Sequence, residues 1–334
     1  MKIENFVRII DGKLRTSPLI DAFGSIHFEL SRISHGDLFI DLASSREDVL
    51  NAIQKGAYAI VTTLVYQNDD EESAWIEVNS IETTLIKLLR FIVTQKSIQL
   101  MVMSSIQMGL LEQIQTPKVL KPLKGDLVFI AKQLLNAKEN DAFFSDNKHL
   151  IANIAPAALH VASLDASLEN TLAKGLFLSS FSYRERYFNE CKLPAHFVAS
   201  LGALLTFCDE HDVAYSLENL SFTEHFFPQF INHTLHKKEF GSSDKALIFE
   251  PSPELLEHHL VYLKETQLLK QTLICLPQTV SVMVEDAPVF IFETLEMLHE
   301  HLKTASYSYA LIALERASFE PYYTKAQTQQ LTLF

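Results

Sequence analysis

Histidine is the residue type in this chain that most readily suggests metal or acid–base chemistry. His225, His233 and His236 lie close together in the sequence, and the pair His258-His259 follows. The spacing of His233 and His236 allows them to share one face of a helix, but no Cys-x-x-Cys, His-x-x-x-His or Glu-x-x-His pattern accompanies these histidines. Histidines without such a pattern are mostly surface or packing residues. We therefore predict no metal site.

Patterns for nucleophiles and for phosphate binding are also sparse. The three cysteines, Cys191, Cys208 and Cys275, are far apart and odd in number, so we expect reduced thiols in packed elements. The Gly-x-Ser-x-Gly signature of serine hydrolases is absent. Only 9 of the 334 residues are glycine, which leaves few for loops that cradle phosphate. The stretch 241–245 (GSSDK) precedes a strand, so we interpret it as a turn.

The composition is that of a globular protein with a large core. Apolar residues make up 48% of the chain, charged residues make up 21%, and the formal net charge is -13. This charge opposes attraction to nucleic-acid phosphates, so we expect no direct nucleic-acid partner. No apolar run approaches the roughly 20 residues that cross a bilayer. The first residues (MKIENFVRIIDGK) lack the apolar core of a secretory signal, and we expect a cytoplasmic protein without membrane insertion.

The first third of the chain alternates between strands and helices. Gly36-Asp37 marks a turn, and a strand at 38–42, a helix that ends at Gly56 and a strand at 58–63 follow. A helix at 82–94 then leads into a strand at 98–103. We place the first domain boundary after residue 95.

The rest of the chain continues this alternation. The predicted helices are 126–136, 194–209, one capped by Ser252 with Pro253 in its first turn, and 295–302. The predicted strands are 150–154, 175–180, 246–249, 273–276, 280–284, 288–292 and 309–314. Apolar strands that alternate with helices are typical of a parallel sheet covered on both faces. The sequence therefore predicts an α/β fold.

Aromatic residues gather in one short segment before the last group of strands. Phe222, Phe226, Phe227 and Phe230 surround Pro228. We interpret them as a hydrophobic plug between domains, whereas an exposed cluster would be a partner site.

The segment Ser31-Arg32-Ile33-Ser34-His35-Gly36-Asp37-Leu38-Phe39-Ile40, followed by 51–61 (NAIQKGAYAIV), resembles the amino-terminal substrate domain of the Mur ligases. These are the ATP-dependent amide-forming enzymes of peptidoglycan precursor synthesis. The resemblance implies a multi-domain α/β protein with a Mur ligase-like N-terminal domain and a C-terminal Rossmann-like parallel sheet. The expected divisions are the N-terminal domain at 1–95, a reduced central α/β domain at 96–240, the C-terminal α/β domain at 241–323 and a tail at 324–334.

In this family, a Ser-Arg pair precedes a Gly-Asp-x-Phe turn and strand, in the domain that holds the uridine diphosphate (UDP) part of the substrate. The resemblance therefore assigns ligand binding to Ser31 and Arg32, and a framework role to Gly36, Asp37 and Phe39. A hydroxyl and a guanidinium can both donate hydrogen bonds to uracil or diphosphate oxygens.

The chain departs from the family next to this pair. Leu30 stands where the family has an acidic residue, and 43–48 (ASSRED) replaces an Asp-Gly-His segment. The alternative interpretation is that Arg32 makes only a surface ion pair and that the segment is a plain strand-turn-helix unit.

A larger departure concerns ATP. A phosphate-binding loop supplies glycines, a lysine and a hydroxyl for magnesium, but the strand ending at Met103 continues into 104–109 (SSIQMG). We therefore interpret the chain as a degenerate, non-catalytic relative of the Mur ligases, without cofactor or catalytic residues. It would bind a UDP-muramyl precursor, or act as an interaction or regulatory protein in cell-wall synthesis. The alternative is a divergent active ligase of peptidoglycan synthesis.

The last five residues suggest a protein partner. Gln330-Leu331-Thr332-Leu333-Phe334 resembles the pentapeptide by which bacterial replication and repair proteins dock onto the sliding clamp. Gln330 would lie at a polar rim, while Leu331, Leu333 and Phe334 would enter an apolar groove. A terminal strand that completes a sheet would have the same pattern. The expected protein partner is a cell-wall enzyme or, as a sliding-clamp-associated adaptor, the clamp.

Overall fold

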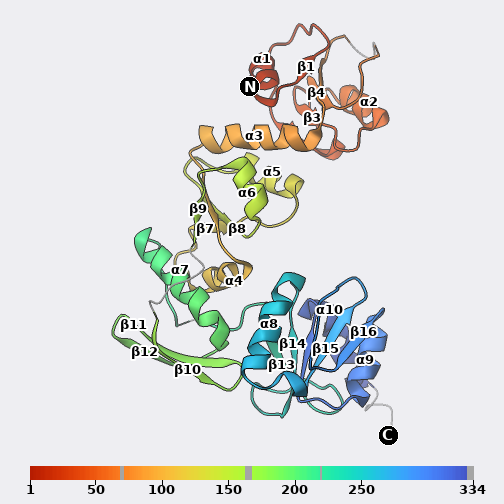
Figure 1. Cartoon of the computed structure of the whole chain (residues 1–334). Coiled ribbons are helices and arrows are strands. Elements are labelled where there is room, and N and C mark those ends of the chain that lie inside the picture. Colours follow the sequence, from red (N-terminus) through yellow and green to blue (C-terminus); the bar gives the residue numbers. More distant parts are fainter. Residues whose placement is uncertain (68–70, 162–167, 219, 329–334) are drawn as a thin grey trace. The chain divides into compact units, whose positions relative to one another are not determined.

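The structure, a computed structural model, describes residues 1–67, 71–161, 168–218 and 220–328 (Figure 1). The chain divides into two compact units, Met1–Met103 with Leu120–His160, and Ser104–Val119 with Val161–Phe334. The division at residues 95, 240 and 323 that the sequence suggests stays a prediction. Among the described residues, no helix is both long and apolar enough to cross a bilayer.

The first unit begins with a five-stranded sheet in the order β1-β5-β4-β3-β2. Strands β2 to β5 are parallel, and β1 is antiparallel to β5. Its elements are α1 (Ile3–Ile10), β1 (Lys13–Leu14), β2 (Ile26–His27), the 3-10 helix η1 (Leu30–Arg32), β3 (Leu38–Ile40), α2 (Arg46–Gln54), β4 (Ala59–Thr62) and β5 (Ala74–Glu77). The predicted strand-helix-strand order is confirmed. Ser45 caps α2 by accepting the Asp48 N–H at 3.2 Å, and Gly56, at φ +91°, ends the turn that follows it.

The same unit contains a four-stranded parallel sheet in the order β7-β8-β6-β9. Its elements are α3 (Ile81–Gln95), β6 (Gln99–Val102), β7 (Leu120–Pro122), α5 (Leu127–Leu135), β8 (Ala142–Ser145), α6 (Lys148–Ile154) and β9 (Leu159–His160). The predicted strand at 150–154 is wrong, because Asn147 accepts the Leu150 N–H at 3.0 Å and starts α6. Ile151 and Ile154 lie on its buried side. Buried residues of α3 belong to one core cluster that reaches into both sheets.

The second unit contains an antiparallel sheet, β10-β11-β12, and two packed helices, α4 and α7. The elements are α4 (Ser105–Ile114), β10 (Glu169–Lys174), β11 (Leu178–Tyr183), β12 (Arg186–Cys191), η2 (Ala195–Phe197) and α7 (Val198–Glu210). The strand predicted at 175–180 begins later, at Leu178, because Gly175 adopts φ +63° in the turn before it. The predicted helix at 194–209 is confirmed, with a 3-10 first turn.

The C-terminal sheet follows the order β13-β14-β17-β15-β16, with β13 antiparallel to β14 and the other pairs parallel. Its elements are β13 (Phe227–Ile231), β14 (Lys245–Phe249), α8 (Pro253–Glu265), η3 (Leu269–Gln271), β15 (Thr272–Pro277), β16 (Val289–Phe292), α9 (Leu295–Thr304), β17 (Tyr309–Ile312) and α10 (Arg316–Thr328). The parallel sheet of an α/β fold is thus confirmed. The strand predicted at 280–284 is wrong, because β16 occupies the place beside β15 and leaves this segment unpaired.

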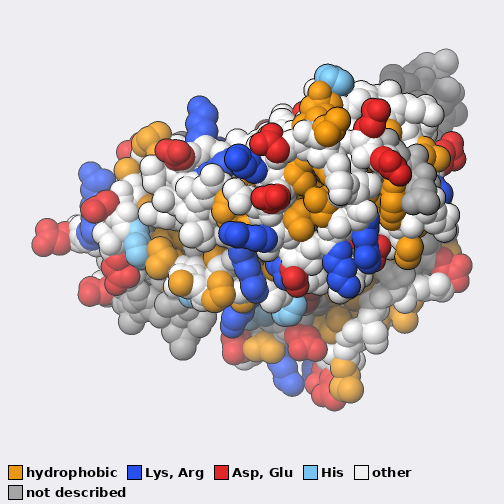
Figure 2. All heavy atoms as spheres, turned by 90° about the horizontal axis from the view of Figure 1, so that it is seen from above, with side chains coloured by type: hydrophobic (Ala, Val, Ile, Leu, Met, Phe, Trp, Pro, Cys, Tyr) orange, Lys and Arg blue, Asp and Glu red, His pale blue; other side chains and the backbone are white. Residues whose placement is uncertain are grey.

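The aromatic cluster lies inside the second unit. The ring of Phe177 lies 6.1 Å from that of Phe226 and 5.9 Å from those of Phe230 and Tyr309, measured between ring centroids. Phe226 and Phe230 are buried. These rings therefore pack the turn before β11 against the C-terminal sheet. On the face of the molecule seen in Figure 2, basic and acidic side chains are interspersed among apolar ones.

Candidate functional site

The predicted ligand-binding pair lies on η1, and both side chains are exposed. Arg32 lines a cavity of about 290 Å³, which we call the Arg32 cavity. Ser31 is not among its lining residues. The other lining residues come from the segment around β2 and from α5, namely Gly24, Ser25, Ile26, His27, Phe28, Glu29, Lys132, Leu135 and Asn136. The structure thus brings Arg32, but not Ser31, to this cavity.

Two cations and one anion set the charge of the Arg32 cavity. The Arg32 Nε lies 3.5 Å from a Glu29 carboxylate oxygen, and Lys132 pairs with the same carboxylate. The hydrogen bond and the charge of Lys132 lower the pKa of Glu29. Because one carboxylate faces two cations, the group keeps one net positive charge, which suits an anionic ligand.

Two of the three predicted framework residues, Gly36 and Asp37, hold the segment that forms the wall of this cavity. The Asp37 carboxylate accepts the Ser25 N–H at 2.9 Å and the Ser34 N–H at 3.0 Å. Gly36 adopts φ +92°, and its carbonyl accepts the Gly24 N–H at 2.8 Å. These bonds tie the turn before β3 to the segment that enters β2. Phe39 lies elsewhere, in a core cluster on the other face of the sheet.

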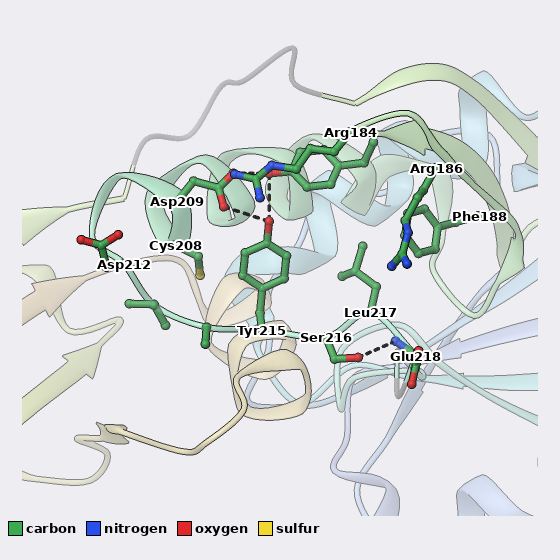
Figure 3. A pocket seen from close by; sticks show the side chains of 13 residues that line it. Arg184, Arg186, Phe188, Cys208, Asp209, Asp212, Tyr215, Ser216, Leu217 and Glu218 are labelled. Carbon is green, nitrogen blue, oxygen red and sulfur yellow. Dashed lines mark hydrogen bonds and ion pairs between the residues drawn. The ribbon is translucent and has the colours of Figure 1, made fainter.

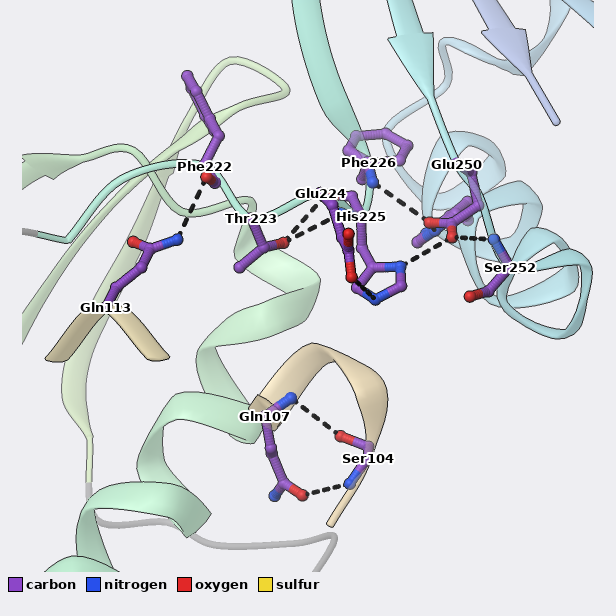
Figure 4. Close-up of polar contacts among 11 residues, drawn as sticks. Ser104, Gln107, Gln113, Phe222, Thr223, Glu224, His225, Phe226, Glu250 and Ser252 are labelled. Atoms are coloured by element: carbon purple, nitrogen blue, oxygen red, sulfur yellow. Dashed lines mark hydrogen bonds and ion pairs between the residues drawn. The ribbon is translucent and has the colours of Figure 1, made fainter. Parts of the chain in front are cut away.

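The second candidate site is the connection from β6 to α4, because nucleotide-binding proteins often bind phosphate at such a strand-to-helix connection. It consists of Met103 and Ser104 only. The Ser104 hydroxyl accepts the Gln107 N–H at 3.2 Å, and the Gln107 amide oxygen accepts the Ser104 N–H at 2.9 Å (Figure 4). This capping box satisfies helix N–H groups from within the chain. Gly109 lies inside α4, where an added Cβ would come within 3.1 Å of the Thr223 Cβ. A glycine here therefore allows α4 to pack closely against Thr223.

The connection from β14 to α8 is built around a buried carboxylate, Glu250. It accepts hydrogen bonds from His225 Nδ1 at 2.8 Å and His259 Nε2 at 2.6 Å. It also accepts the backbone N–H groups of Phe226 at 3.2 Å and Ser252 at 2.7 Å (Figure 4). We call these five residues the Glu250 network. Ser252 occupies the N-cap position as predicted, but its backbone N–H, rather than its hydroxyl, makes this contact.

The surroundings of the Glu250 network favour a charged carboxylate at Glu250 and a neutral ring at His259. Burial alone would raise the pKa of Glu250. The hydrogen bonds from His225 and His259 outweigh this effect and lower the pKa to about 2. Burial lowers the pKa of His259, which keeps that ring neutral. Glu250 is therefore an ionised carboxylate that four donors hold in place.

Three histidines adjoin this network, and we call them the histidine cluster: His196 of η2, and His258 and His259 of α8. The His196 Nε2 lies 3.1 Å from the His259 Nδ1. Burial, followed by the neighbouring His259 and His258, lowers the pKa of His196 to about 2. The sequence signalled only the adjacent pair in α8 and gave no sign of His196 or Glu250.

The other histidines considered in the sequence are placed differently. His233 and His236 lie in the loop after β13, so they do not share the helical face that their spacing would allow. His236 Nδ1 lies 2.9 Å from the Thr234 hydroxyl, which gives this ring a local role in the turn. His225 belongs to the Glu250 network.

A larger cavity, of about 540 Å³, lies beside β11 and the end of α7 (Figure 3). Asp209 is one of its lining residues and accepts the Tyr183 hydroxyl, the Tyr215 hydroxyl at 2.9 Å and an Arg184 N–H at 2.6 Å. Burial and then the hydrogen bond to Asp209 raise the pKa of Tyr183. Because Asp209 is fully engaged and the phenol stays protonated, the arrangement favours a structural role over proton transfer.

The remaining predictions concern cysteines and the tail. Cys191, Cys208 and Cys275 are free, as expected, and burial raises the pKa of Cys208 to about 12. The clamp-docking pentapeptide, with Gln330, Leu331, Leu333 and Phe334, lies outside the described residues. Its role stays a prediction.

Comparison with known proteins identifies the fold. No family model matches the chain, and no curated protein matches it significantly. A MurF ligase from Thermotoga maritima in complex with ADP matches with a TM-score of 0.59 and 12% identity, over 92% of this chain and 98% of that one. A MurF from Acinetobacter baumannii matches with a TM-score of 0.57 and 10% identity, over 98% of both chains. The chain therefore has a Mur ligase-like, multi-domain α/β fold, as predicted.

Proposed function

We propose that this chain is a non-catalytic protein of Mur ligase-like fold that binds a UDP-muramyl precursor at the Arg32 cavity without using ATP. One similar structure, from Acinetobacter baumannii, is described as a UDP-N-acetylmuramoylalanyl-D-glutamyl-2,6-diaminopimelate–D-alanyl-D-alanyl ligase. The observation that carries the proposal is the connection between β6 and α4, which a capping box closes.

The β6–α4 connection argues against nucleotide binding there. Phosphate-binding loops need several residues between strand and helix, so that backbone N–H groups can surround the phosphate, and they carry a lysine. Here two residues make the connection, and the next lysine along the chain is Lys118, after α4 has ended. The Gln107 N–H, which would otherwise face a ligand, is bonded to Ser104.

The Arg32 cavity supports binding of an anionic ligand. Arg32 and Lys132 can each exchange the exposed Glu29 carboxylate for a diphosphate oxygen, because surface ion pairs contribute little stability. The volume of about 290 Å³ suits one part of a nucleotide sugar rather than the whole molecule. The diphosphate with its ribose would occupy the cavity, and the muramyl peptide would extend outside it.

Calorimetric titration of the full chain with a UDP-N-acetylmuramoyl peptide tests the proposal. We expect binding that Arg32→Ala and Lys132→Ala each weaken about tenfold or more, since a hydrogen bond to a charged group contributes roughly 1.5–3 kcal/mol. Arg8→Ala is the matched control, because Arg8 is an exposed arginine of the same unit that does not line the cavity. Absence of binding, or equal binding by all four proteins, would contradict the proposal.

The alternative, a divergent active ligase, makes a different prediction. Such an enzyme would turn over ATP in the presence of the precursor and an amino-acid or dipeptide acceptor. Release of inorganic phosphate that depends on all three substrates would support the ligase. Precursor binding without phosphate release would support the non-catalytic protein.

A further inference from the structure

The histidine cluster has a geometry that the proposed function does not explain. His196, His258 and His259 each offer one ring nitrogen, and these three nitrogens lie within 4.8 Å of one another. We propose that they bind a divalent transition-metal ion of the zinc class. This inference concerns a different place in the fold from the Arg32 cavity and is independent of it.

His259 is held in the orientation that a metal ligand needs. Its Nε2–H donates to the buried Glu250 carboxylate at 2.6 Å, so its Nδ1 carries the lone pair. That lone pair faces His196 Nε2 at 3.1 Å. A carboxylate that fixes the tautomer of a histidine and raises its basicity is a frequent second partner in metal sites. Glu250 stays in place when the metal binds, because Phe226 and Ser252 donate their backbone N–H groups to it.

The nitrogen separations fit a small cation. Zn–N bonds are about 2.0–2.1 Å long in tetrahedral sites, which places two ligand nitrogens about 3.3 Å apart. His196 and His259 are already close to that separation. His258 is exposed, so its ring can turn to close the remaining gap, and no hydrogen bond to another described residue holds it.

Packing fixes the position of His196. Its ring stacks on Tyr262 with the centroids 4.0 Å apart, and it meets Phe226 edge to face at 4.9 Å. Its Nδ1 is buried without a hydrogen-bond partner among the described residues. In the metal-free protein the His196 Nε2–H donates to His259 Nδ1. When Nε2 binds the ion, the ring proton moves to Nδ1, and the ion replaces the hydrogen bond between the two rings.

The ligand set indicates which ions fit. Three imidazole nitrogens suit Zn²⁺ and its neighbours Co²⁺, Ni²⁺ and Cu²⁺, whereas Mg²⁺ and Ca²⁺ prefer oxygen. The exposed side, at His258, leaves a fourth position for water. Because η2 leads into α7 while α8 follows β14 of the C-terminal sheet, the ion would cross-link these two parts of the second unit and stabilise its folded state.

The test compares the full chain with two variants, after a chelator has removed bound metal. His258→Gln removes one ligand from an exposed position, and His233→Gln is the matched control, an exposed histidine outside the cluster. Titration with Zn²⁺ is expected to show one tight site in the unchanged protein and in His233→Gln, weakened tenfold or more in His258→Gln. Co²⁺ is expected to give the strong visible absorption of a four-coordinate ion in the first two proteins alone.

Thermal unfolding separates ligand loss from damage to the fold. Without metal, the three proteins should unfold at the same temperature, and Zn²⁺ should raise that temperature for all but His258→Gln. The proposal is overturned if His258→Gln binds Zn²⁺ as tightly as the unchanged protein, or if Co²⁺ gives only the weak spectrum of a six-coordinate ion.

Discussion

Two strand-to-helix connections, β6–α4 and β14–α8, satisfy the polar groups at the start of a helix in different ways (Figure 4). Each follows a parallel strand at its carboxyl end, the edge where α/β proteins usually bind ligands. The first is neutral, and the side chains of Ser104 and Gln107 close it. The second is built around the buried charge of Glu250, which also orients His225 and His259. The first connection therefore only starts a helix, whereas the second organises a group of ionisable side chains.

The largest expected effect is on the charged connection. Glu250→Ala would leave two histidine N–H groups and two backbone N–H groups buried without their acceptor. We expect a loss of about 3–5 kcal/mol in the free energy of unfolding, as for other broken buried pairs. Urea unfolding followed by circular dichroism measures it. An unchanged midpoint would mean that the Glu250 network does not stabilise the fold.

Acid should weaken the same connection. The carboxyl of Glu250 has a pKa of about 2 in the folded chain, against an ordinary value of 4.5. Because the folded value is the lower one, the stabilisation is complete above about pH 4.5 and is lost as the pH falls from there towards 2. It amounts to about 3 kcal/mol.

Glu250→Gln provides the comparison for this pH effect, because it has no carboxyl to protonate. The difference in unfolding free energy between the two proteins should shrink from pH 6 to pH 3, if both remain folded enough to measure. A difference that stays constant over this range would contradict the assignment of an ionised Glu250.

The smallest effect is expected at the neutral connection. Ser104→Ala removes one acceptor from the start of α4, which typically costs about 1 kcal/mol. The same urea experiment measures this change. If Ser104→Ala destabilised the chain more than Glu250→Ala, the β6–α4 connection would contribute more to stability than the β14–α8 connection, contrary to expectation.

Local signals explain which elements were predictable. The turn at Gly36 and the glycine after α2 act within a few residues, and the sequence located both of them. The cap at Ser45 is equally local but was not predicted. The apolar run 150–154 is too short to distinguish a strand from a helix, and the cap at Asn147 decides for the helix. At 280–284, the missing information was the pairing of β15 with β16, which joins residues beyond any local pattern.

Site residues were likewise predictable only where the signal lies in one continuous segment of the chain. Arg32 was found because a family resemblance extended over a continuous segment, and the structure places it at a cavity. Lys132 reaches the same cavity from α5, 100 residues after Arg32 along the chain, and no sequence pattern links the two. His196 and His259 are likewise 63 residues apart and meet only because η2 packs against α8.

We propose that this chain retains the Mur ligase-like fold but does not bind ATP. Calorimetric titration of the full chain with ATP and Mg²⁺ tests it most directly, with a UDP-N-acetylmuramoyl peptide as the parallel ligand. We predict heat of binding for the peptide precursor and none for ATP up to millimolar concentration. Tight, magnesium-dependent binding of ATP would contradict the account.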